Sequence, residues 1–377
     1  MYCSSSGSSI VSSSMAEFDY SHRVVKLQEL MSEIGVGATL LSVGADLPYF
    51  TGYEAMPTER LTMLVVPVVG DPILFIPRLE APRVVAGDFE MLAWDETDDP
   101  VALVAKAASG AERALIGDHT WSVFLVGLQK ELPDISWAPA STVTKQLRMR
   151  KDRGEIEALR SAAHGVDRVL ARVPGEVVFA GRTEVEVAND LRRMTVEEGH
   201  EMAAFAIVAS GPNGASPHHE PEQRVIEPGD LAICDFGGRY EGYYSDVTRT
   251  FSVGDPTQEQ VEIHAVVAAA NAAGQSAVGP GVPCQEVDRA TRYVVVEAGY
   301  GEYFIHRTGH GIGLEVHEHP YLVEGNDLGL EAGMTFSIEP GIYLPGQLGV
   351  RIEDIAVCTE TGIDALNRAD RNLVVVA

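Results

Sequence analysis

Four carboxylates in the second half of the chain stand within or directly beside apolar segments. They are Asp235, Asp246, Glu339 and Glu353. A charged side chain that is buried without a partner is strongly destabilising, so each of these carboxylates requires a cation, a metal ion or a set of hydrogen-bond donors. The need for such partners at strand ends restricts the possible folds more than any other feature of the sequence.

The first two carboxylates lie on a predicted β-hairpin in the segment LAICDFGGRYEGYYSDVTRTF, residues 231–251. A turn centred on Tyr240 and Glu241 places Asp235 directly opposite Asp246, where Cβ atoms are about 5 Å apart and like charges repel. A cation between the two carboxylates removes this conflict. The alternative is a shifted register, in which both aspartates are ordinary turn or edge residues.

Histidines are dense in the segment HRTGHGIGLEVHEHP, residues 306–320. Among them, His310 has a glycine on each side, which lets the backbone approach a bound ion closely. A lone histidine is usually structural or on the surface, but four histidines within fourteen residues favour a functional site. The sequence lacks the HExxH pattern of single-zinc proteases, so that type of metal helix is not predicted.

The remaining two carboxylates lie near the end of the chain. Glu339 ends an apolar strand, and Pro340 keeps it extended while preventing the strand from simply continuing. A strand predicted over residues 349–359 carries Arg351 and Glu353 on one face, because side chains alternate along a strand. That run is otherwise apolar enough to be buried. Both glutamates are therefore predicted to be metal ligands or members of salt bridges.

Together these segments offer four carboxylates and one imidazole, a set suited to two divalent ions that share bridging carboxylates. The candidate ligands are Asp235, Asp246, His310, Glu339 and Glu353. Four negative charges balance two divalent ions. Ligation mostly by oxygen favours a hard ion such as Mn²⁺, with Co²⁺, Fe²⁺ and Zn²⁺ as alternatives, over a thiolate site. The four cysteines form no CxxC pair, which also argues against a thiolate site.

The two halves of the chain differ in their apolar pattern. In the first half, apolar runs rich in β-branched residues alternate with helix-like stretches, which predicts an α/β layer. A strong helix start follows, where Asp152 and Glu155 fit a capping box. Beyond it, helices interleave with hairpins, as in an α+β fold with antiparallel sheet. We therefore predict a disordered extension over residues 1–15, a smaller α/β domain over residues 16–148 and an α+β domain over residues 149–377.

The charge balance excludes one class of partner. The chain of 377 residues has 28 Lys and Arg against 55 Asp and Glu, a formal net charge of -27. Nucleic-acid binding requires clustered cations, so we expect no nucleic-acid partner. No apolar run approaches the ~18 residues of a membrane span. The first fifteen residues carry neither the cations nor the apolar core of a secretory signal. We therefore expect a soluble protein of the reducing cytoplasm.

Five segments of the second half occur in an order that is specific to one family. They are SGPNGASPHH (210–219), DFGGRYEGYYSDVTRTF (235–251), GHGIGLEVHEHP (309–320), SIEPGIY (337–343) and VRIED (350–354). With them the chain resembles the M24 metallopeptidases of pita-bread fold, in the Xaa-Pro dipeptidase (prolidase) and Xaa-Pro aminopeptidase branch. The leading domain, including YFTGYE at 49–54, resembles the creatinase-type amino-terminal domain. The resemblance covers nearly the whole chain.

The resemblance implies a role for each candidate residue. It makes the five candidate ligands a dinuclear centre in which Asp246 and Glu353 bridge both ions. His218 matches a histidine that contacts substrate beside the scissile bond, although the adjacent His219 leaves an ambiguity of one position. His317 matches the second substrate-facing histidine. The alternative for these histidines is a surface position without a role.

The implied activity is hydrolysis of an Xaa-Pro bond by a hydroxide that bridges the two metals, with Glu339 as proton shuttle. The substrate is a peptide with proline at the second position, and the family commonly forms homodimers. A dipeptidase must recognise the substrate carboxylate near the site. Arg351, which resembles an arginine of the family's active site, or a cation of a partner subunit is the candidate. We predict a dipeptidase, with an Xaa-Pro aminopeptidase acting on longer peptides as the alternative.

Other members of the pita-bread group fit less well. Methionine aminopeptidase in its usual form lacks a leading domain of this size. Creatinase shares the architecture but works without these metals. A non-catalytic binding module, as in histone chaperones with pita-bread domains, predicts gaps in the ligand set, whereas all five ligand positions are filled here.

Overall fold

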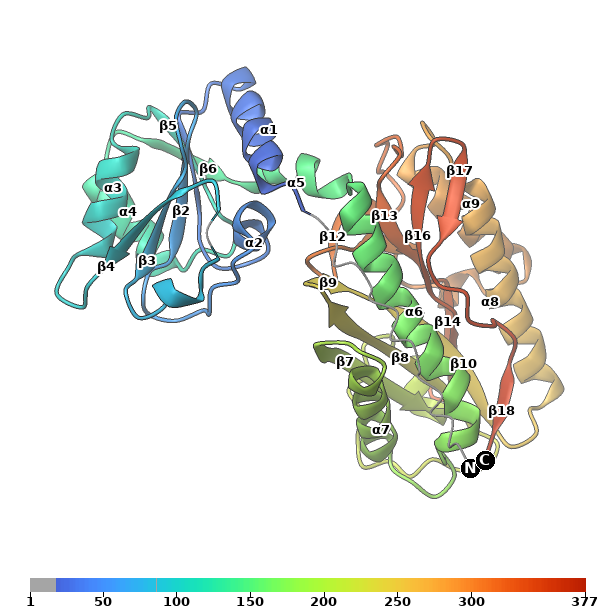
Figure 1. Ribbon diagram of the computed structural model, residues 1–377. Coiled ribbons are helices and arrows are strands. Elements are labelled where there is room, and N and C mark those ends of the chain that lie inside the picture. Colours follow the sequence, from blue (N-terminus) through green and yellow to red (C-terminus); the bar gives the residue numbers. More distant parts are fainter. Residues whose placement is uncertain (1–17, 86) are drawn as a thin grey trace, which may run out of the picture.

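The computed structural model describes residues 18–85 and 87–377. These residues form two lobes joined by a helical segment, and Figure 1 shows the leading lobe in blue to teal and the second lobe in green to red. The predicted disordered extension over residues 1–15 lies outside the described residues. Of the helices in the two described ranges, none combines the length and apolar character needed to cross a membrane.

The leading lobe contains a six-stranded sheet with the strand order β4-β3-β2-β1-β5-β6. Its strands are β1 (Ala38–Leu41), β2 (Met63–Pro67), β3 (Ile73–Pro77), β4 (Glu90–Trp94), β5 (Arg113–Ile116) and β6 (Ser136–Pro139). The central strand β1 pairs in parallel with β5 and antiparallel with β2. Because side chains alternate along a strand, the neighbours Leu40 and Leu41 enter separate apolar cores on opposite faces of this sheet.

Helices cover both faces of the six-stranded sheet. α1 (Tyr20–Glu33) and α2 (Asp46–Thr51) pack on the face nearer the second lobe, and α3 (Pro100–Ala108) and α4 (Ser122–Glu131) pack on the other face (Figure 1). A short 3-10 helix, η1 (Ala81–Arg83), follows β3. This arrangement is the α/β layer that the alternating apolar runs predict.

Two helices connect the lobes, α5 (Ser141–Met149) and α6 (Arg153–Glu176). The predicted capping box at the start of α6 is present. The Glu155 backbone N–H donates to Asp152 Oδ1 at 2.9 Å, and the Asp152 backbone N–H donates to Glu155 Oε2 at 3.0 Å. These bonds satisfy backbone donors that the first turn of a helix would otherwise leave unpaired. The long helix α6 therefore begins at a fixed point directly after the junction.

The second lobe contains three sheets. One five-stranded sheet has the order β18-β10-β8-β7 with β9 beside β8, another has the order β12-β11-β13-β16-β17, and β14 and β15 form a two-stranded sheet. The strands are β7 (Met202–Ser210), β8 (Leu231–Tyr240), β9 (Tyr243–Tyr244), β10 (Val247–Val253), β11 (Gly309–Gly311), β12 (Glu318–Leu322), β13 (Thr335–Ile338), β14 (Gly341–Leu344), β15 (Leu348–Arg351), β16 (Asp354–Thr359), β17 (Gly362–Ala365) and β18 (Val374–Val376).

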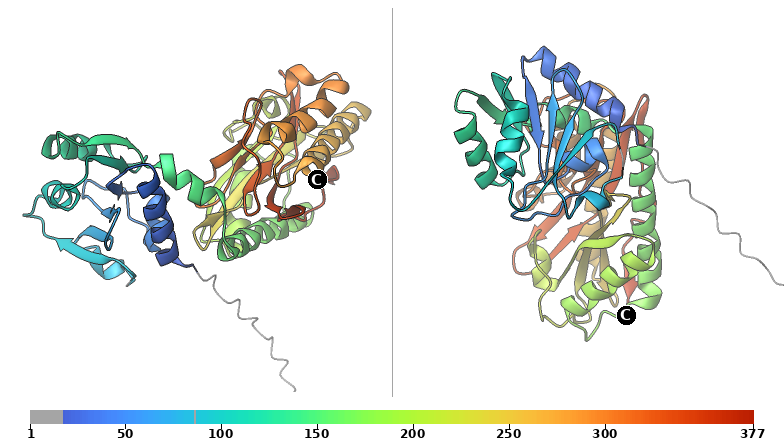
Figure 2. Two further views of the ribbon diagram at one scale, coloured as in Figure 1. Left: turned by 90° about the horizontal axis from the view of Figure 1, so that it is seen from above. Right: turned by 60° about the vertical axis from the view of Figure 1, so that its left-hand side comes forward.

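Helices enclose these sheets from two sides. α6 and α7 (Glu184–Glu197) pack on the sheet of β7, β8 and β10, whereas α8 (Gln258–Ala277) and α9 (Cys284–Glu297) pack on the other sheets (Figures 1 and 2). Two 3-10 helices, η2 (Gly211–Ala215) and η3 (Gly301–Tyr303), follow β7 and α9. The sheets meet between these helices, where β10 contacts β15 and β16.

The predicted register of the first hairpin is wrong. Asp235 pairs with Thr248, two residues beyond the predicted partner Asp246. The turn is centred on Glu241 and Gly242, whose φ values are 48° and 83°, because a two-residue hairpin turn of this type requires positive φ at both central positions. A shift by two residues preserves the face of every side chain, so Asp235 and Asp246 remain on the same side of the sheet.

The predicted single strand over residues 349–359 is also corrected. It is broken at Ile352 and Glu353 into β15 and β16, which belong to different sheets. At the break, Glu353 forms an isolated bridge with Thr248, and its backbone N–H donates to the Thr248 carbonyl at 3.1 Å. Glu353 is therefore fixed at the point where the chain passes from one sheet to the next.

Candidate metal centre

All the predicted site residues meet in one cavity of the second lobe, with a volume of about 860 Å³. It is lined by the five candidate ligands and by His218, His317 and Arg351. The ligands come from separate elements: Asp235 from β8, Asp246 from the link before β10, His310 from β11, Glu339 from the residue after β13, and Glu353 from the break between β15 and β16. The five candidate ligands thus converge from five separate parts of the fold.

The candidate ligand atoms lie close enough to share metal ions. Oxygen atoms of Asp235, Asp246 and Glu353 lie within 4.8 Å of one another, and so do ligand atoms of His310, Glu339 and Glu353. His310 Nε2 lies 3.4 Å from Glu339 Oε1 and 3.7 Å from Asp246 Oδ2. Glu353 takes part in both groups, as a bridging carboxylate must.

The electrostatics of the cluster favour added positive charge. Burial raises the pKa of Asp246 well above its ordinary value, and the carboxylates of Glu353 and Asp235 raise it further. Burial and the charges of Glu339 and Asp235 raise the pKa of Glu353 in the same way, and the pKa of Glu339 rises to about 7, mainly through burial. Asp235 Oδ1 and Glu353 Oε1 are buried without a hydrogen-bond partner among the described residues. The donor set therefore fits two divalent cations.

His310 is prepared to act as a neutral nitrogen ligand. Burial lowers its pKa to about 3, so the imidazole is uncharged at neutral pH. Its Nδ1 lies 3.1 Å from the Gly311 carbonyl, to which a protonated Nδ1 donates, and this leaves the lone pair of Nε2 toward the carboxylates. The His310 backbone N–H donates to Ser337 Oγ at 3.1 Å, which also fixes the strand.

The glycines beside His310 have a structural cause that the sequence does not reveal. A Cβ on Gly309 would lie 1.9 Å from the Ser337 carbonyl oxygen, and a Cβ on Gly311 would lie 2.1 Å from the His319 carbonyl oxygen. The backbone of β11 thus approaches its two neighbouring strands too closely for a side chain. The sequence predicts a close approach to an ion, whereas the structure shows a close approach to protein backbone.

Arg351 donates a hydrogen bond from each of its side-chain nitrogens, and it contacts the candidate ligand Asp235 directly. Its Nη2 donates to Asp235 Oδ2 at 2.6 Å, its Nη1 donates to Tyr343 Oη at 2.9 Å, and its Nε donates to Thr248 Oγ1 at 3.1 Å. Thr248 in turn donates to Glu353 Oε2 at 2.7 Å. Of the two contacts predicted for Arg351, the structure shows the one with the surroundings of Glu353, and each of its three side-chain nitrogens already donates a hydrogen bond within the protein.

The structure separates the two adjacent histidines of the SPHH segment. His218 lines the cavity. His219 instead places Nε2 2.8 Å from Glu184 Oε2, and the same glutamate accepts hydrogen bonds from the backbone and hydroxyl of Ser210. Although burial opposes ionisation, these bonds leave the pKa of Glu184 below its ordinary value. Glu184 therefore anchors the segment from which His218 faces the cavity.

His317 lies beside the ligands. Its ring centroid is 4.1 Å from that of His310, and its ligand atom lies within 4.8 Å of those of Asp246 and His310. The side chain is part of the cavity wall, in a segment whose neighbours Glu315 and Glu318 point elsewhere. This position allows the imidazole of His317 to donate a hydrogen bond to a molecule that enters the cavity.

His306 and Arg307 are two further polar residues of the cavity that were not among the predicted site residues. His306 Nε2 accepts a hydrogen bond from Tyr343 Oη at 2.8 Å, which extends the Arg351 network along the wall. Arg307 stacks its guanidinium 4.4 Å from the centroid of the Tyr321 ring and forms no ion pair or side-chain hydrogen bond with the described residues. Both residues lie in the histidine-rich segment. The feature of the sequence that could have identified Arg307 as a cavity residue was its position next to His306.

Comparisons with known proteins cover both lobes. The model of metallopeptidase family M24 matches residues 157–360, and the model of the creatinase/prolidase N-terminal domain matches residues 23–150. The probable dipeptidase PepE of Mycobacterium tuberculosis is 43% identical over 364 residues, covering 95% of this chain and 96% of that protein. The Xaa-Pro dipeptidase of Lactobacillus helveticus is 34% identical over 364 residues, covering 93% and 98%. The crystal structure of prolidase from Thermococcus sibiricus matches with a TM-score of 0.91 at 38% identity, covering 96% and 100%.

Proposed function

The chain belongs to metallopeptidase family M24, in the branch of the Xaa-Pro dipeptidases, and on that basis we propose that it hydrolyses Xaa-Pro dipeptides. The chain is a peptidase, and the predicted fold class, a pita-bread catalytic domain after a creatinase-like leading domain, is confirmed. The preference for dipeptides and the roles of individual residues are our proposal.

We infer that the five candidate ligands hold two divalent ions. Their close approach and the two unpartnered carboxylate oxygens support this assignment. When bound, the ions neutralise the carboxylates, lower the pKa of water and polarise the scissile carbonyl. We keep Mn²⁺ as the expected ion because oxygen ligands dominate, with Co²⁺, Fe²⁺ and Zn²⁺ as alternatives.

The chain's own residues then handle protons and charge. Glu339 lies at the cavity, where its carboxylate can take a proton from the attacking water and deliver it to the leaving proline nitrogen. Its Oε1 accepts a hydrogen bond from Ser337 Oγ at 3.2 Å, which orients the carboxylate. His218 and His317 face the same cavity, where their N–H groups would stabilise the oxyanion that develops on the scissile carbonyl.

The observation that carries the dipeptide preference is the guanidinium of Arg307, which forms no ion pair or side-chain hydrogen bond with the residues that the structure describes. A dipeptide carries its carboxylate on the proline that follows the scissile bond, whereas a longer peptide has an uncharged amide there. The other two arginines of the cavity are engaged within the protein: Arg351 donates to Asp235, Tyr343 and Thr248. Arg192 donates to Asn189 Oδ1 at 3.1 Å and to the Ala206 carbonyl at 3.2 Å. Arg307 faces the cavity without an ionic partner among the described residues, and stacking on Tyr321 holds it in place. We assign the substrate carboxylate to Arg307.

The test compares Ala-Pro, Ala-Pro amide and Ala-Pro-Ala as substrates. The wild type should prefer Ala-Pro, and Arg307→Met should lower kcat/KM for Ala-Pro by about 10- to 100-fold, the scale of a charge-assisted hydrogen bond. Ala-Pro amide is the matched control, and its hydrolysis should not respond to the substitution. Arg307→Lys should retain part of the preference because it keeps the charge without the planar fork. Equal hydrolysis of Ala-Pro and Ala-Pro-Ala by the wild type would instead assign an aminopeptidase.

Three finer expectations accompany this proposal. We propose a homodimer, as the family resemblance implies. We propose a reducing, cytoplasmic location, which is supported by three buried free cysteines, Cys234, Cys284 and Cys358. We also propose that residues 16–148 and 149–377 are separate domains, since every sheet of the described residues draws its strands from one side of residue 149.

A further inference from the structure

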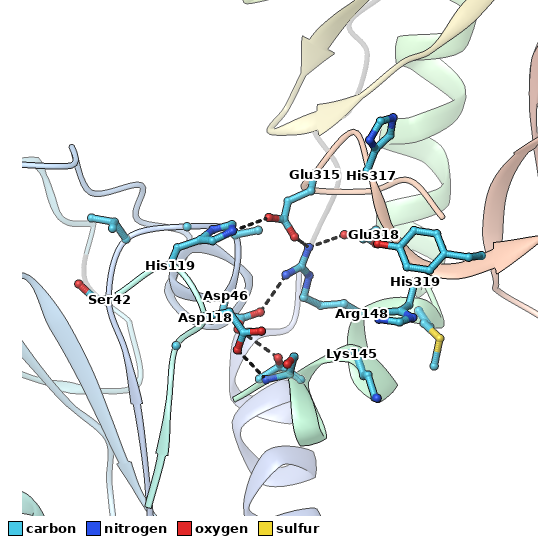
Figure 3. A pocket seen from close by; sticks show the side chains of 18 residues that line it. Ser42, Asp46, Asp118, His119, Lys145, Arg148, Glu315, His317, Glu318 and His319 are labelled. Carbon is cyan, nitrogen blue, oxygen red and sulfur yellow. Dashed lines mark hydrogen bonds and ion pairs between the residues drawn. The ribbon is translucent and has the colours of Figure 1, made fainter. Parts of the chain in front are cut away.

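A second cavity lies between the two lobes, with a volume of about 250 Å³ (Figure 3). The leading lobe contributes Asp46 to its wall, α5 contributes Arg148, and the link before β12 contributes Glu315 and His317. His317 lines this cavity as well as the metal cavity. The proposed substrate-facing histidine is therefore part of the contact region between the lobes.

Arg148 is the centre of this region, as Figure 3 shows. Its side chain is only 12% exposed. One end of the guanidinium, Nη1, donates to Asp46 Oδ1 at 2.9 Å, and the other end, Nη2, donates to Glu315 Oε2 at 2.5 Å and also to Glu318 Oε2. A single arginine thus joins the leading lobe to the two glutamates that flank His317.

The segment from Glu315 to Glu318, which contains His317, is held firmly at its Glu318 end. Lys151 Nζ donates to Glu318 Oε1 at 2.6 Å, and this lysine is 1% exposed. Glu318 pairs across the sheet with Gly311, the residue after the ligand His310. Burial opposes ionisation of Glu318, but Lys151 and Arg148 outweigh it and leave the pKa of this carboxyl below its ordinary value. The ion pairs are therefore present at neutral pH.

The Glu315 end depends more heavily on Arg148. Glu315 has one other potential partner in the cavity, His119 Nε2 at 3.6 Å, which carries a charge only when protonated. Without Arg148, the carboxylates of Asp46, Glu315 and Glu318 would face one another in a poorly solvated space. Their repulsion would be strongest at Glu315, because Lys151 remains with Glu318.

We propose that Arg148 is a positioning residue for His317, which it holds in the metal cavity by clamping Glu315 and Glu318 against Asp46 of the leading lobe. This inference rests on the proposed function, in which His317 contacts the substrate. It assigns the leading lobe a part in turnover. The planar guanidinium suits this part because it reaches three carboxylates at once.

Steady-state kinetics on Ala-Pro with Mn²⁺-loaded protein provide the first test. Arg148→Met should lower kcat by about 10- to 100-fold, the scale for a displaced supporting group, with KM and metal content little changed. Arg148→Lys should fall between this variant and the wild type. Arg239→Met is the matched control, because Arg239 joins the lobes elsewhere, to Glu54 at 2.8 Å, and should leave kcat within about twofold.

A double-mutant cycle distinguishes positioning of His317 from general support of the fold. In an His317→Asn background, Arg148→Met should cause no further loss of kcat, because the residue through which it acts is gone. Additive losses would overturn the proposal, as would an equal loss of kcat in Arg239→Met. Thermal unfolding of each variant shows whether it is folded at the assay temperature.

A spectroscopic measurement is independent of peptide hydrolysis. In protein labelled with ¹³C-histidine, the His317 resonance is assigned by its loss in His317→Asn. That resonance should shift in Arg148→Met and stay in place in Arg239→Met. An unchanged His317 resonance in Arg148→Met would overturn the proposal. If the wild type hydrolyses no Xaa-Pro dipeptide, the proposed function fails, while this measurement still decides whether Arg148 positions His317.

Discussion

Glu318 at the lobe junction and Glu353 in the metal cavity are both buried glutamates, with side chains 7% and 2% exposed, but their pKa values shift in opposite directions. Glu318 has two cations in direct contact, Arg148 and Lys151. Glu353 has the hydroxyl of Thr248 as a donor and two carboxylates among its main electrostatic neighbours. Burial alone therefore does not decide ionisation; the local number of cations does.

This comparison separates two kinds of charge cluster. The protein supplies the cations at the junction, so that cluster is complete without a ligand. In the cavity, Arg351 contacts Asp235, and the raised pKa values of Asp246, Glu339 and Glu353 indicate a deficit of positive charge. The first cluster is neutralised by the protein's own cations, and the second fits a site for added ions.

The largest effect is expected from removing a ligand. Glu353→Ala or Asp246→Ala should abolish activity and the binding of at least one ion, because each carboxylate contributes to the proposed bridge. Elemental analysis and release of proline from Ala-Pro measure the two losses. Glu318→Gln is the matched control and should keep the full metal content. Full turnover by metal-free wild type would contradict the assignment of the cavity.

A smaller effect is expected at the junction, and it should concern stability. Lys151→Met leaves Glu318 with Arg148 alone and should lower the free energy of unfolding by about 3 kcal/mol, the scale for breaking a buried ion pair. Denaturant unfolding measures this change, which should be the same with and without added Mn²⁺. A loss below about 1 kcal/mol would place this pair with ordinary surface ion pairs.

The smallest effect is the pH dependence of stability in the metal-free protein. Because folding raises the pKa of Glu339 from 4.5 to about 7, the folded state binds the proton more tightly than the unfolded state between these values. Stability should therefore fall as pH rises from about 4.5 to 7, by on the order of 1–3 kcal/mol. Thermal unfolding in chelator across this range measures the slope. Glu339→Gln should reduce it, and saturating Mn²⁺ should remove it, since bound ions favour the ionised carboxylates.

The prediction that Asp235 and Asp246 lie on one face of the hairpin holds, although the predicted register of the hairpin is wrong. The alternation of side chains fixes which face Asp235 and Asp246 share, and that face is unchanged by a shift of two residues. The exact partner of Asp235 depends on the turn, where Gly242 permits a positive φ that the pattern of apolar residues does not reveal. The sequence also does not reveal that the predicted strand breaks at Glu353, because this break depends on the bridge between Glu353 and Thr248.

Three arginines line the cavity, Arg192, Arg307 and Arg351, and the sequence could not show which of them is free to meet a substrate. The family resemblance left two roles open for Arg351, contact with the surroundings of Glu353 and contact with substrate. Its actual partners, Asp235 and Tyr343, come from other strands. Arg192 donates to Asn189 Oδ1 and to the Ala206 carbonyl, whereas Arg307 stacks on the ring of Tyr321 and has no ionic partner among the described residues. Whether an arginine is free depends on contacts that form only after several distant segments have come together.

The two glycines beside His310 also bear on how other sequences of this kind are judged. Neither position has room for even a methyl group, since the carbonyl oxygens of Ser337 and His319 occupy that space. A chain that retains every ligand but carries a larger residue at either position cannot adopt the same strand spacing. Screens for active relatives, and libraries that vary this region, should therefore treat Gly309 and Gly311 as strictly as the ligands themselves.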